Sequence, residues 1–225
     1  ISSIRAVFNF AISEYALDLK NPFVGMYFDK SAGVSKRLPI PIEDIRKVQN
    51  QCRLIDDDLR WLVALVSDTG MRLAEGAGLL KSDIILDADI PHISLKPHPW
   101  RPLKTSGSQR DIPLVGASLW AAQRLSEAFP DSPYAFPRYN RKNTTKSNSA
   151  SAALNKWLHQ YVPGGCTMHS FRHSMRDRLK AVQCSADITD QIGGWATDGA
   201  GQGYGSGYPL DVLQEWMEKA IVSLD

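Results

Sequence analysis

The chain has 225 residues, of which 43% are hydrophobic and 22% charged, and its formal net charge at pH 7 is only +2. This composition is that of an ordinary soluble globular protein, long enough for one large domain or for one domain with a fragment of another. No apolar run approaches the ~18 residues that a membrane-spanning helix needs, and no charged-then-apolar secretory start is present. We therefore expect no membrane partner.

The first residue is Ile rather than Met, so we expect the natural protein to extend further toward its N-terminus. The three cysteines, Cys52, Cys166 and Cys184, are odd in number and form no close pair in the sequence. That pattern argues against a disulfide framework or a zinc ribbon and suits a reducing cytoplasm. We expect three small buried or half-buried thiols without a special role.

Helical spacing of apolar residues dominates the first third of the chain. We expect a helix over residues 1–19, a linker rich in Pro and Gly over residues 20–41, and a second helix from about Ile42. Residues 59–68 are strongly apolar and predict a buried helix. The pattern continues over residues 73–80 after a glycine break.

Three short segments that are β-branched and bounded by Pro, Gly or Asp predict strands over residues 83–86, 92–95 and 111–115. Helical spacing resumes toward the C-terminus, over residues 117–128, 149–161, 169–182, 186–192 and 210–222. The sequence therefore predicts a mainly α-helical fold with one small three-stranded antiparallel β-sheet, in the α+β class.

Positive charge is concentrated between residues 101 and 146, where eight bases accompany three acids. Such a surplus suits a phosphate backbone, and a solvated basic loop is the alternative. The side chains we expect to contact DNA are Arg101, Arg110, Arg138, Arg141, Lys142 and Lys146. The last predicted helix carries an apolar stripe that can pack against its own domain.

The segment His169-Ser170-Phe171-Arg172-His173 places three polar side chains on one face of a predicted helix, because positions three and four apart share a face. His169 and His173 have the spacing of a zinc-binding pair. The intervening Glu of a zinc-protease helix is missing, however, and no third ligand is evident. A metal site is therefore disfavoured, and a second feature is needed to indicate a function.

That feature is residues 68–75, where Arg72 follows a glycine break at the mouth of a helix and is displayed rather than buried. Its planar guanidinium can bind two phosphate oxygens at once, whereas the alternative is a surface arginine paired with Glu75. Lys104 lies in the polar turn before a predicted strand, from which its ammonium can donate a proton to a departing alkoxide. The alternative for Lys104 is an ordinary solvated lysine.

The segment Gly193-Gly194-Trp195 is followed by Tyr204, nine residues after the tryptophan, among many glycines. A tryptophan after two glycines usually packs. A tyrosine in a glycine-rich segment, in contrast, is suited to presentation to solvent or to a ligand. Tyr208 is a second candidate, but its place beside Pro209 and the final predicted helix indicates packing.

Taken together, the order Arg, Lys, His-x-x-Arg, Trp, Tyr resembles the tyrosine recombinase, or phage integrase, family. The segments TGMR-x-x-E, KT…R-x-IPL, HSFRH and GGW with its Tyr fall in that family's order over residues 38–222. The resemblance implies that residues 1–20 are the last helix of a truncated N-terminal DNA-binding domain, residues 21–41 an interdomain linker, and residues 42–225 the catalytic domain. Trp195 is a departure, since many members carry His there, and an indole can only donate its N–H.

The resemblance assigns roles at one scissile phosphate to Arg72, Lys104, His169, Arg172, Trp195 and Tyr204. Two guanidinium groups clamp the non-bridging oxygens, and the indole adds an N–H. The phenol attacks phosphorus, the imidazole accepts its proton, and the ammonium protonates the leaving 5′ oxygen. The implied products are a 3′-phosphotyrosine and a free 5′-hydroxyl.

These groups supply the positive charge that other nucleases take from Mg²⁺, so we expect no metal and no nucleotide cofactor. The run Asp56-Asp57-Asp58 predicts a solvated helix start rather than a Mg²⁺ site. The resemblance implies double-stranded DNA as the partner, a homo-oligomer with a dimer on each site and a tetramer in the synapsis, and accessory DNA-bending proteins in a DNA-associated place in the cytoplasm. It also offers a second alternative for the apolar stripe of the last predicted helix, which is docking on a neighbouring protomer.

The expected function is therefore that of a site-specific recombinase that integrates or excises a mobile element. Three alternatives stay open at this point. One is a type IB topoisomerase-like enzyme that nicks and closes DNA with the same groups. The others are a DNA-binding relative without catalysis, and a nuclease that releases both DNA ends.

Overall fold

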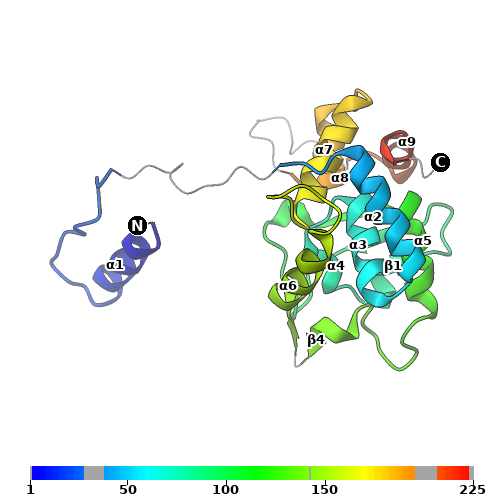
Figure 1. Ribbon diagram of the computed structural model, residues 1–225. Helices are drawn as coiled ribbons and strands as arrows, with labels where there is room; N and C mark the ends of the chain where they lie inside the picture. Colours follow the sequence, from blue (N-terminus) through cyan, green and yellow to red (C-terminus); the bar gives the residue numbers. More distant parts are fainter. Residues whose placement is uncertain (1, 28–37, 142, 196–206, 223–225) are drawn as a thin grey trace. The chain divides into compact units, whose positions relative to one another are not determined.

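The computed structural model describes residues 2–27, 38–141, 143–195 and 207–222. It divides into two compact units, residues 1–36 and residues 37–225 (Figure 1). The first unit holds helix α1 (Ser2–Glu14), which is shorter than the predicted helix because Ala16 adopts a left-handed backbone conformation with φ 47°. The segment after it folds back, and the Arg5 Nε donates to the Phe23 carbonyl at 2.8 Å.

Helix α3 (Asp58–Thr69) is central to the second unit. Every side chain from Leu62 to Thr69 is buried, which is possible only for a helix covered on all sides. The covering helices are α2 (Ile42–Ile55), α5 (Gly116–Glu127) and α7 (Ser170–Ala181). The buried helix predicted from the apolar run at residues 59–68 is therefore confirmed.

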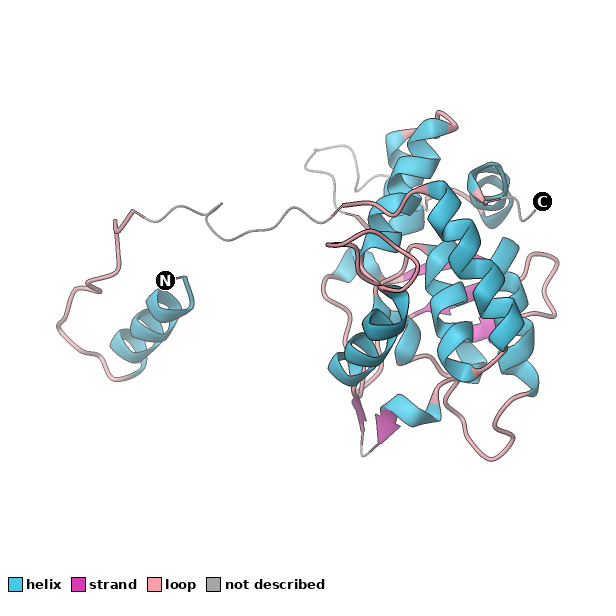
Figure 2. Cartoon of the chain, viewed as in Figure 1, coloured by secondary structure: helices cyan, strands magenta, loops and turns pink. Residues whose placement is uncertain are grey.

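A three-stranded antiparallel sheet lies among the helices (Figure 2). Its strands are β1 (Ile84–Ile85), β2 (His92–Leu95) and β3 (Arg110–Pro113), in that order. Ile93 pairs with Ile112, and both side chains are fully buried. The mainly helical fold with one small three-stranded sheet is thus confirmed.

The other elements of the second unit are α4 (Leu73–Ala77), α6 (Ser147–Leu158), α8 (Ala186–Gly193), α9 (Leu210–Ala220), and the 3₁₀ turns η1 (Lys81–Asp83), η2 (Ser106–Ser108) and η3 (Pro137–Tyr139). The sequence did not predict the hairpin of β4 (Asn140–Arg141) and β5 (Thr144–Thr145), because two-residue strands are too short to show an alternating pattern.

Helix α9 packs against α7 and β3 of its own unit. Leu213, Met217 and Ala220 of its apolar stripe are buried there, which matches the first of the two alternatives considered for this stripe. The three cysteines are also buried, as predicted. None of the helices within the described ranges is both long and apolar enough to cross a membrane.

Candidate active site

Arg72 stands at the start of α4, directly after the end of α3. Gly70 ends α3 in a left-handed conformation, with φ 62°, and turns the chain so that Arg72 precedes the first turn of α4. The Arg72 backbone N–H donates to the Glu75 carboxylate at 2.9 Å, and its Nη1 donates to the same carboxylate at 2.5 Å and to the Ser108 hydroxyl at 3.1 Å. The side chain is 24% exposed, so Arg72 is both paired with Glu75 and open to solvent.

Arg172 lies in the first turn of α7 and is buried. Its Nη1 donates to the carbonyl of Gly70 at 2.9 Å and to that of Gly193, and its Nη2 donates to the carbonyl of Gly194 at 3.2 Å. A guanidinium has five N–H groups. These three bonds fix its plane and leave two N–H groups uncommitted among the described residues.

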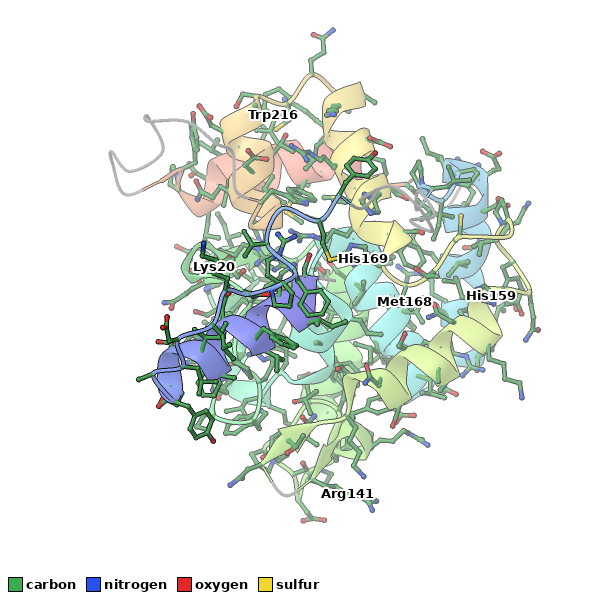
Figure 3. All side chains as sticks on the ribbon, turned by 90° about the vertical axis from the view of Figure 1, so that its left-hand side faces the viewer. Lys20, Arg141, His159, Met168, His169 and Trp216 are labelled. Atoms are coloured by element: carbon green, nitrogen blue, oxygen red, sulfur yellow. The ribbon has the colours of Figure 1, made fainter. Side chains whose placement is uncertain are left out.

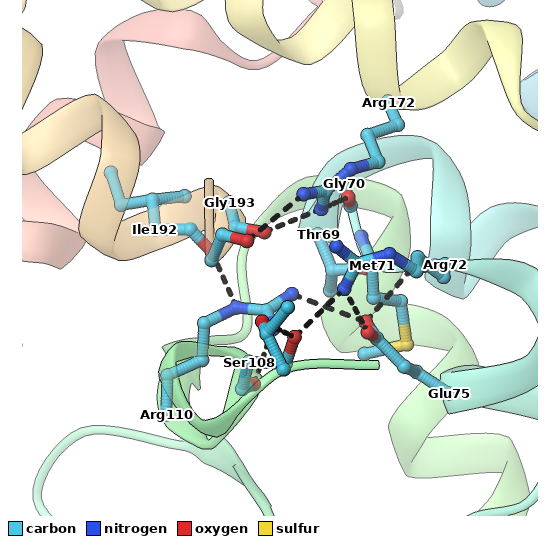
Figure 4. Close-up of polar contacts among 12 residues, drawn as sticks. Thr69, Gly70, Met71, Arg72, Glu75, Ser108, Arg110, Arg172, Ile192 and Gly193 are labelled. Carbon is cyan, nitrogen blue, oxygen red and sulfur yellow. Dashed lines mark hydrogen bonds and ion pairs between the residues drawn. The ribbon is translucent and has the colours of Figure 1, made fainter. Parts of the chain in front are cut away.

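Arg72 and Arg172 belong to one cluster that also contains Glu75, Ser108 and Arg110 (Figure 4). The cluster contains three guanidinium groups and one carboxylate, which Arg72 and Arg110 contact, so these four groups carry a surplus of two positive charges. Burial, followed by the charges of Arg72 and Arg110, lowers the pKa of Arg172 to about 9. Burial by itself would raise the pKa of Glu75, but Arg110 and Arg72 outweigh it and lower that pKa, so Glu75 is ionised at neutral pH. The cluster is therefore suited to hold an anion.

Trp195 is part of the same cluster. Its ring packs against the Arg172 guanidinium, 4.4 Å from the ring centroid, and against that of Arg176 at 5.3 Å. The two preceding glycines allow this arrangement. A Cβ at Gly193 would overlap the Trp195 ring, and Gly194 has a left-handed φ of 60° with its backbone close to Arg110. Trp195 therefore packs, as its two glycines indicate, and it packs on a candidate catalytic arginine.

His169 lies at the N-terminal end of α7, just before the first turn that holds Arg172 (Figure 3). Its backbone carbonyl accepts from the Arg172 N–H at 3.1 Å, and its ring meets that of His173 edge to face, with centroids 5.2 Å apart. The described residues contain no group of three or more His, Cys, Asp or Glu side chains that could hold a metal ion.

Lys104 is exposed in the connection between β2 and β3 and forms no hydrogen bond or ion pair with the described residues. The connection nevertheless reaches the arginine cluster, because the Ser108 hydroxyl accepts from Arg72. The Ser108 hydroxyl also lies 2.9 Å from the Thr105 hydroxyl. The structure thus brings Arg72, Arg172 and Trp195 into one cluster. Lys104 and His169 stand on the segments that border them.

The predicted nucleophile, Tyr204, lies outside the described residues. Tyr208 is described, and the prediction that it packs is wrong, since the residue is 40% exposed. Its backbone is held instead, because Gln191 bonds both the N–H and the carbonyl of Tyr208 at 2.8 Å. Tyr208 precedes α9, and the buried apolar stripe of that helix begins only at Leu213, so Tyr208 is not part of the stripe.

Two of the predicted DNA contacts are not exposed surface side chains. Arg101 and Arg110 are 2% and 8% exposed, and internal partners hold their guanidinium groups. Arg101 donates to the Gly78 carbonyl and faces the Asp83 carboxylate at 3.6 Å, while Arg110 faces Glu75. Their charges belong to internal pairs, which the count of bases along the segment cannot distinguish from surface charges.

The other predicted DNA contacts differ among themselves. Arg141 and Lys146 are exposed on the β4–β5 hairpin and at the start of α6, and Lys142 lies outside the described residues. Arg138 is exposed, but it forms two bonds with Asp58, at 2.8 and 3.0 Å. Figure 3 shows Arg141 at the opposite end of the second unit from Trp216 on α9.

The acidic run before α3 starts that helix, as predicted. Asp57 is its N-cap and accepts from the Arg60 N–H at 2.9 Å. Asp56 pairs with Arg124 at 2.7 Å, so the run is partly neutralised by neighbours rather than fully solvated.

Sequence reasoning treated Glu75 only as a surface partner and Arg110 only as a DNA contact. One signal for Arg110 was available. Side chains of a strand alternate between its two faces, so Arg110 points to the same face as Ile112. Because Ile112 is apolar and faces inward, Arg110 is expected to face inward as well.

A family model described as the phage integrase family matches residues 42–218. No curated protein sequence matches the chain significantly. Among solved structures, the integrase of transposon Tn1549 in complex with circular intermediate DNA is similar at TM-score 0.57 and 18% identity, over 95% of this chain and 75% of that one. The XerA recombinase is similar at TM-score 0.51 and 18% identity, over 95% and 68%.

A third similar structure is the XerH site-specific recombinase bound to a palindromic difH substrate in a post-cleavage complex. It has TM-score 0.52 and 16% identity, over 80% of this chain and 52% of that chain. At these identities the likeness concerns the fold. It agrees with the helical domain and small sheet described above.

Proposed function

The chain belongs to the phage integrase family, whose members are tyrosine-type site-specific DNA recombinases, and from this premise we propose that it cleaves and rejoins DNA through a covalent 3′-phosphotyrosine at Tyr204. The proposed role is the integration or excision of a mobile element. Two of the structural neighbours have related contexts: the Tn1549 integrase comes from a transposon and is bound to circular intermediate DNA, and XerH is bound to its substrate after cleavage.

The observation that carries the proposal is the fixed pair of guanidinium groups, Arg72 and Arg172, in a cluster with surplus positive charge. In-line attack on a phosphodiester places extra negative charge on the non-bridging oxygens. Donors that are already oriented stabilise that charge without reorganising during the reaction. Glu75 and Ser108 hold Arg72, and three backbone carbonyls hold Arg172, so both are oriented before DNA binds.

In the proposed first step the Tyr204 oxygen attacks the scissile phosphorus and the bond to the 5′ oxygen breaks. His169 accepts the phenolic proton and Lys104 donates a proton to the leaving 5′ oxygen. A phenol with an unperturbed pKa of ~10 is mostly protonated at neutral pH, so positive charge around the phosphate would also assist its ionisation. A 5′-hydroxyl from another strand then attacks the phosphotyrosine. This rejoins DNA without ATP, because the ester bond retains the free energy.

The proposed partner is double-stranded DNA, bound by a dimer on each site and by a tetramer when two sites meet, with accessory DNA-bending proteins. Trp195 is proposed to donate its indole N–H to a non-bridging oxygen. Because the positive charge comes from side chains, we propose that neither a metal ion nor a nucleotide is needed.

The decisive experiment traps the covalent adduct. The chain is incubated in EDTA with a pool of nicked duplexes of random sequence, and adducts that survive detergent are collected and mapped by peptide mass spectrometry. We expect phosphorylated Tyr204. Tyr204→Phe should abolish the adduct and leave duplex affinity within a few-fold, because only the reacting oxygen is lost, whereas Tyr208→Phe should still form it.

An adduct on Tyr208, or one that forms only when metal is added, would contradict the mechanism. No adduct with the unaltered chain would favour a DNA-binding relative without catalysis. DNA recovered from the adducts then supplies substrates for two further assays. Exchange of strands between two sites identifies a recombinase, and relaxation of a supercoil without exchange identifies a topoisomerase.

A further inference from the structure

Arg110 is the buried arginine that opens β3, and each of its nitrogens is engaged. Its Nη1 donates to the Ser108 carbonyl at 2.7 Å, its Nε donates to the Ile192 carbonyl at 2.9 Å, and its Nη2 lies 3.3 Å from the Glu75 carboxylate (Figure 4). These partners come from three segments that are far apart in the sequence. A buried guanidinium without partners is costly, so each of these bonds is favoured in the folded protein. Through them Arg110 holds the three segments together.

Each of the three segments leads to a group in the proposed reaction. Ser108 lies near the end of the β2–β3 connection, which carries Lys104, and its hydroxyl accepts from Arg72. Glu75 orients Arg72. Ile192 is the last residue before Gly193 and Gly194, whose carbonyls bind Arg172, and before Trp195.

The contact between Arg110 and the end of α8 is especially close. The last carbonyls of a helix have no partner within it. Here three consecutive carbonyls are taken by two arginines: Arg110 binds that of Ile192, and Arg172 binds those of Gly193 and Gly194. A Cβ at Gly194 would lie 2.7 Å from the Arg110 Nη1, so a glycine is needed for the guanidinium to reach this position.

We propose that Arg110 is a positioning residue, which locks the β2–β3 connection, the start of α4 and the end of α8 in register and does not touch DNA. This inference rests on the proposed function. A guanidinium suits the task because its N–H groups point in fixed directions in one plane. A lysine has a single nitrogen and cannot reach three partners in that plane.

Arg178 offers a matched control. It is also buried and also binds one carboxylate and two backbone carbonyls: Asp68 at 2.9 Å, Ser67 at 2.5 Å and Ala220 at 3.2 Å. Its partners lie on α3 and α9, and none of them bonds directly to a group in the proposed reaction. Arg110→Lys and Arg178→Lys should therefore lower the melting temperature to a similar extent.

The experiment compares the wild type with both variants on DNA recovered from wild-type adducts. For each protein we measure the melting temperature, the single-turnover rate of adduct formation at saturating DNA, and the dissociation constant for DNA at several salt concentrations. Arg110→Lys should slow adduct formation about tenfold or more, since small misplacements of reacting groups have such effects. Its DNA affinity and salt dependence should match the wild type. Arg178→Lys should keep the rate within about twofold.

If Arg110→Lys does not fold, Arg110→Gln, which removes the charge but retains a hydrogen-bonding side chain, takes its place with the same expected loss of rate. Equal rates for the Arg110 and Arg178 variants would overturn the inference. So would a weaker, less salt-dependent DNA affinity of the Arg110 variant, since that is the mark of a direct phosphate contact. If the wild type forms no adduct, the proposed function fails first and this inference fails with it.

Discussion

Glu75 is the residue that balances the charge of the candidate active site. It accepts from Arg72 and faces Arg110, and together these arginines hold its pKa below the ordinary value of 4.5 in spite of its burial. Without this carboxylate the three guanidinium groups would repel one another in a poorly solvated place. The same carboxylate orients Arg72, so stability and the proposed catalysis depend on one side chain.

Replacing Glu75 should therefore change how stability depends on pH. A carboxylate whose folded-state pKa is lowered stabilises the fold above its unfolded pKa, and this contribution is lost as the pH falls through the folded-state value. Glu75→Gln should cost about 3 kcal/mol or more at pH 7, because it leaves buried charges unopposed. The difference from wild type should shrink below about pH 4.5.

Urea unfolding of both proteins between pH 3 and pH 8 checks this, since two-state fits give the free energy of unfolding at each pH. A difference that stays constant over the whole range would show that the Glu75 carboxylate does not act through its charge. Glu43→Gln, at an exposed position on α2, is the control and should show no such convergence.

At the scale of elements, the two ends of α3 decide where the first candidate arginine stands. Asp57 begins the helix by accepting from the Arg60 N–H, and Gly70 ends it in a left-handed conformation, two residues before Arg72. Both ends follow local rules, since Asp is a favoured N-cap and Gly is the favoured residue at a left-handed helix end. The position of Arg72 is therefore set by the start and stop of one buried helix.

Asp57→Ala should lower the free energy of unfolding by about 1 kcal/mol, because it removes the N-cap acceptor. Asp57→Asn keeps a side-chain oxygen in the same place and should lie within about 0.5 kcal/mol of the wild type. Denaturant titration of the three proteins distinguishes the two results. If the Asn variant loses as much as the Ala variant, the ion pair of Asp57 with Arg60 at 3.3 Å matters more than the cap.

At the scale of the whole molecule, the net charge of +2 conceals how the bases are used. Arg101 and Arg110 are neutralised inside the second unit, and Arg138 is paired with Asp58 on its surface. Arg141 and Lys146, in contrast, are exposed near the β4–β5 hairpin. We therefore propose that the hairpin and the start of α6 contribute phosphate contacts through Arg141 and Lys146.

Each of these contacts should appear in the salt dependence of DNA binding. Arg141→Ala and Lys146→Ala should each reduce the slope of log affinity against log salt concentration by about one. Arg138→Ala should reduce it less, because its guanidinium already has two bonds to Asp58. Fluorescence anisotropy with a random-sequence duplex at several salt concentrations measures the slopes. Equal reductions for all three variants would show that the Asp58 pair opens on DNA.

The sequence by itself determined the buried helix α3, the order of helices and strands, and the motifs around Arg72 and Arg172. Apolar spacing, glycine breaks and helix faces are local properties, so they can be read along the chain. The same reasoning missed the β4–β5 hairpin, where strands of two residues leave no pattern.

Only the tertiary structure decided which charges are internal and which face solvent. Arg110 is joined to Glu75 across 35 positions and to Ile192 across 82, and no local pattern announces such partners. A buried charge is tolerated only where distant segments supply a carboxylate and carbonyls together. For that reason two arginines that were predicted to contact DNA proved to be interior residues, and one of them connects the segments of the candidate site.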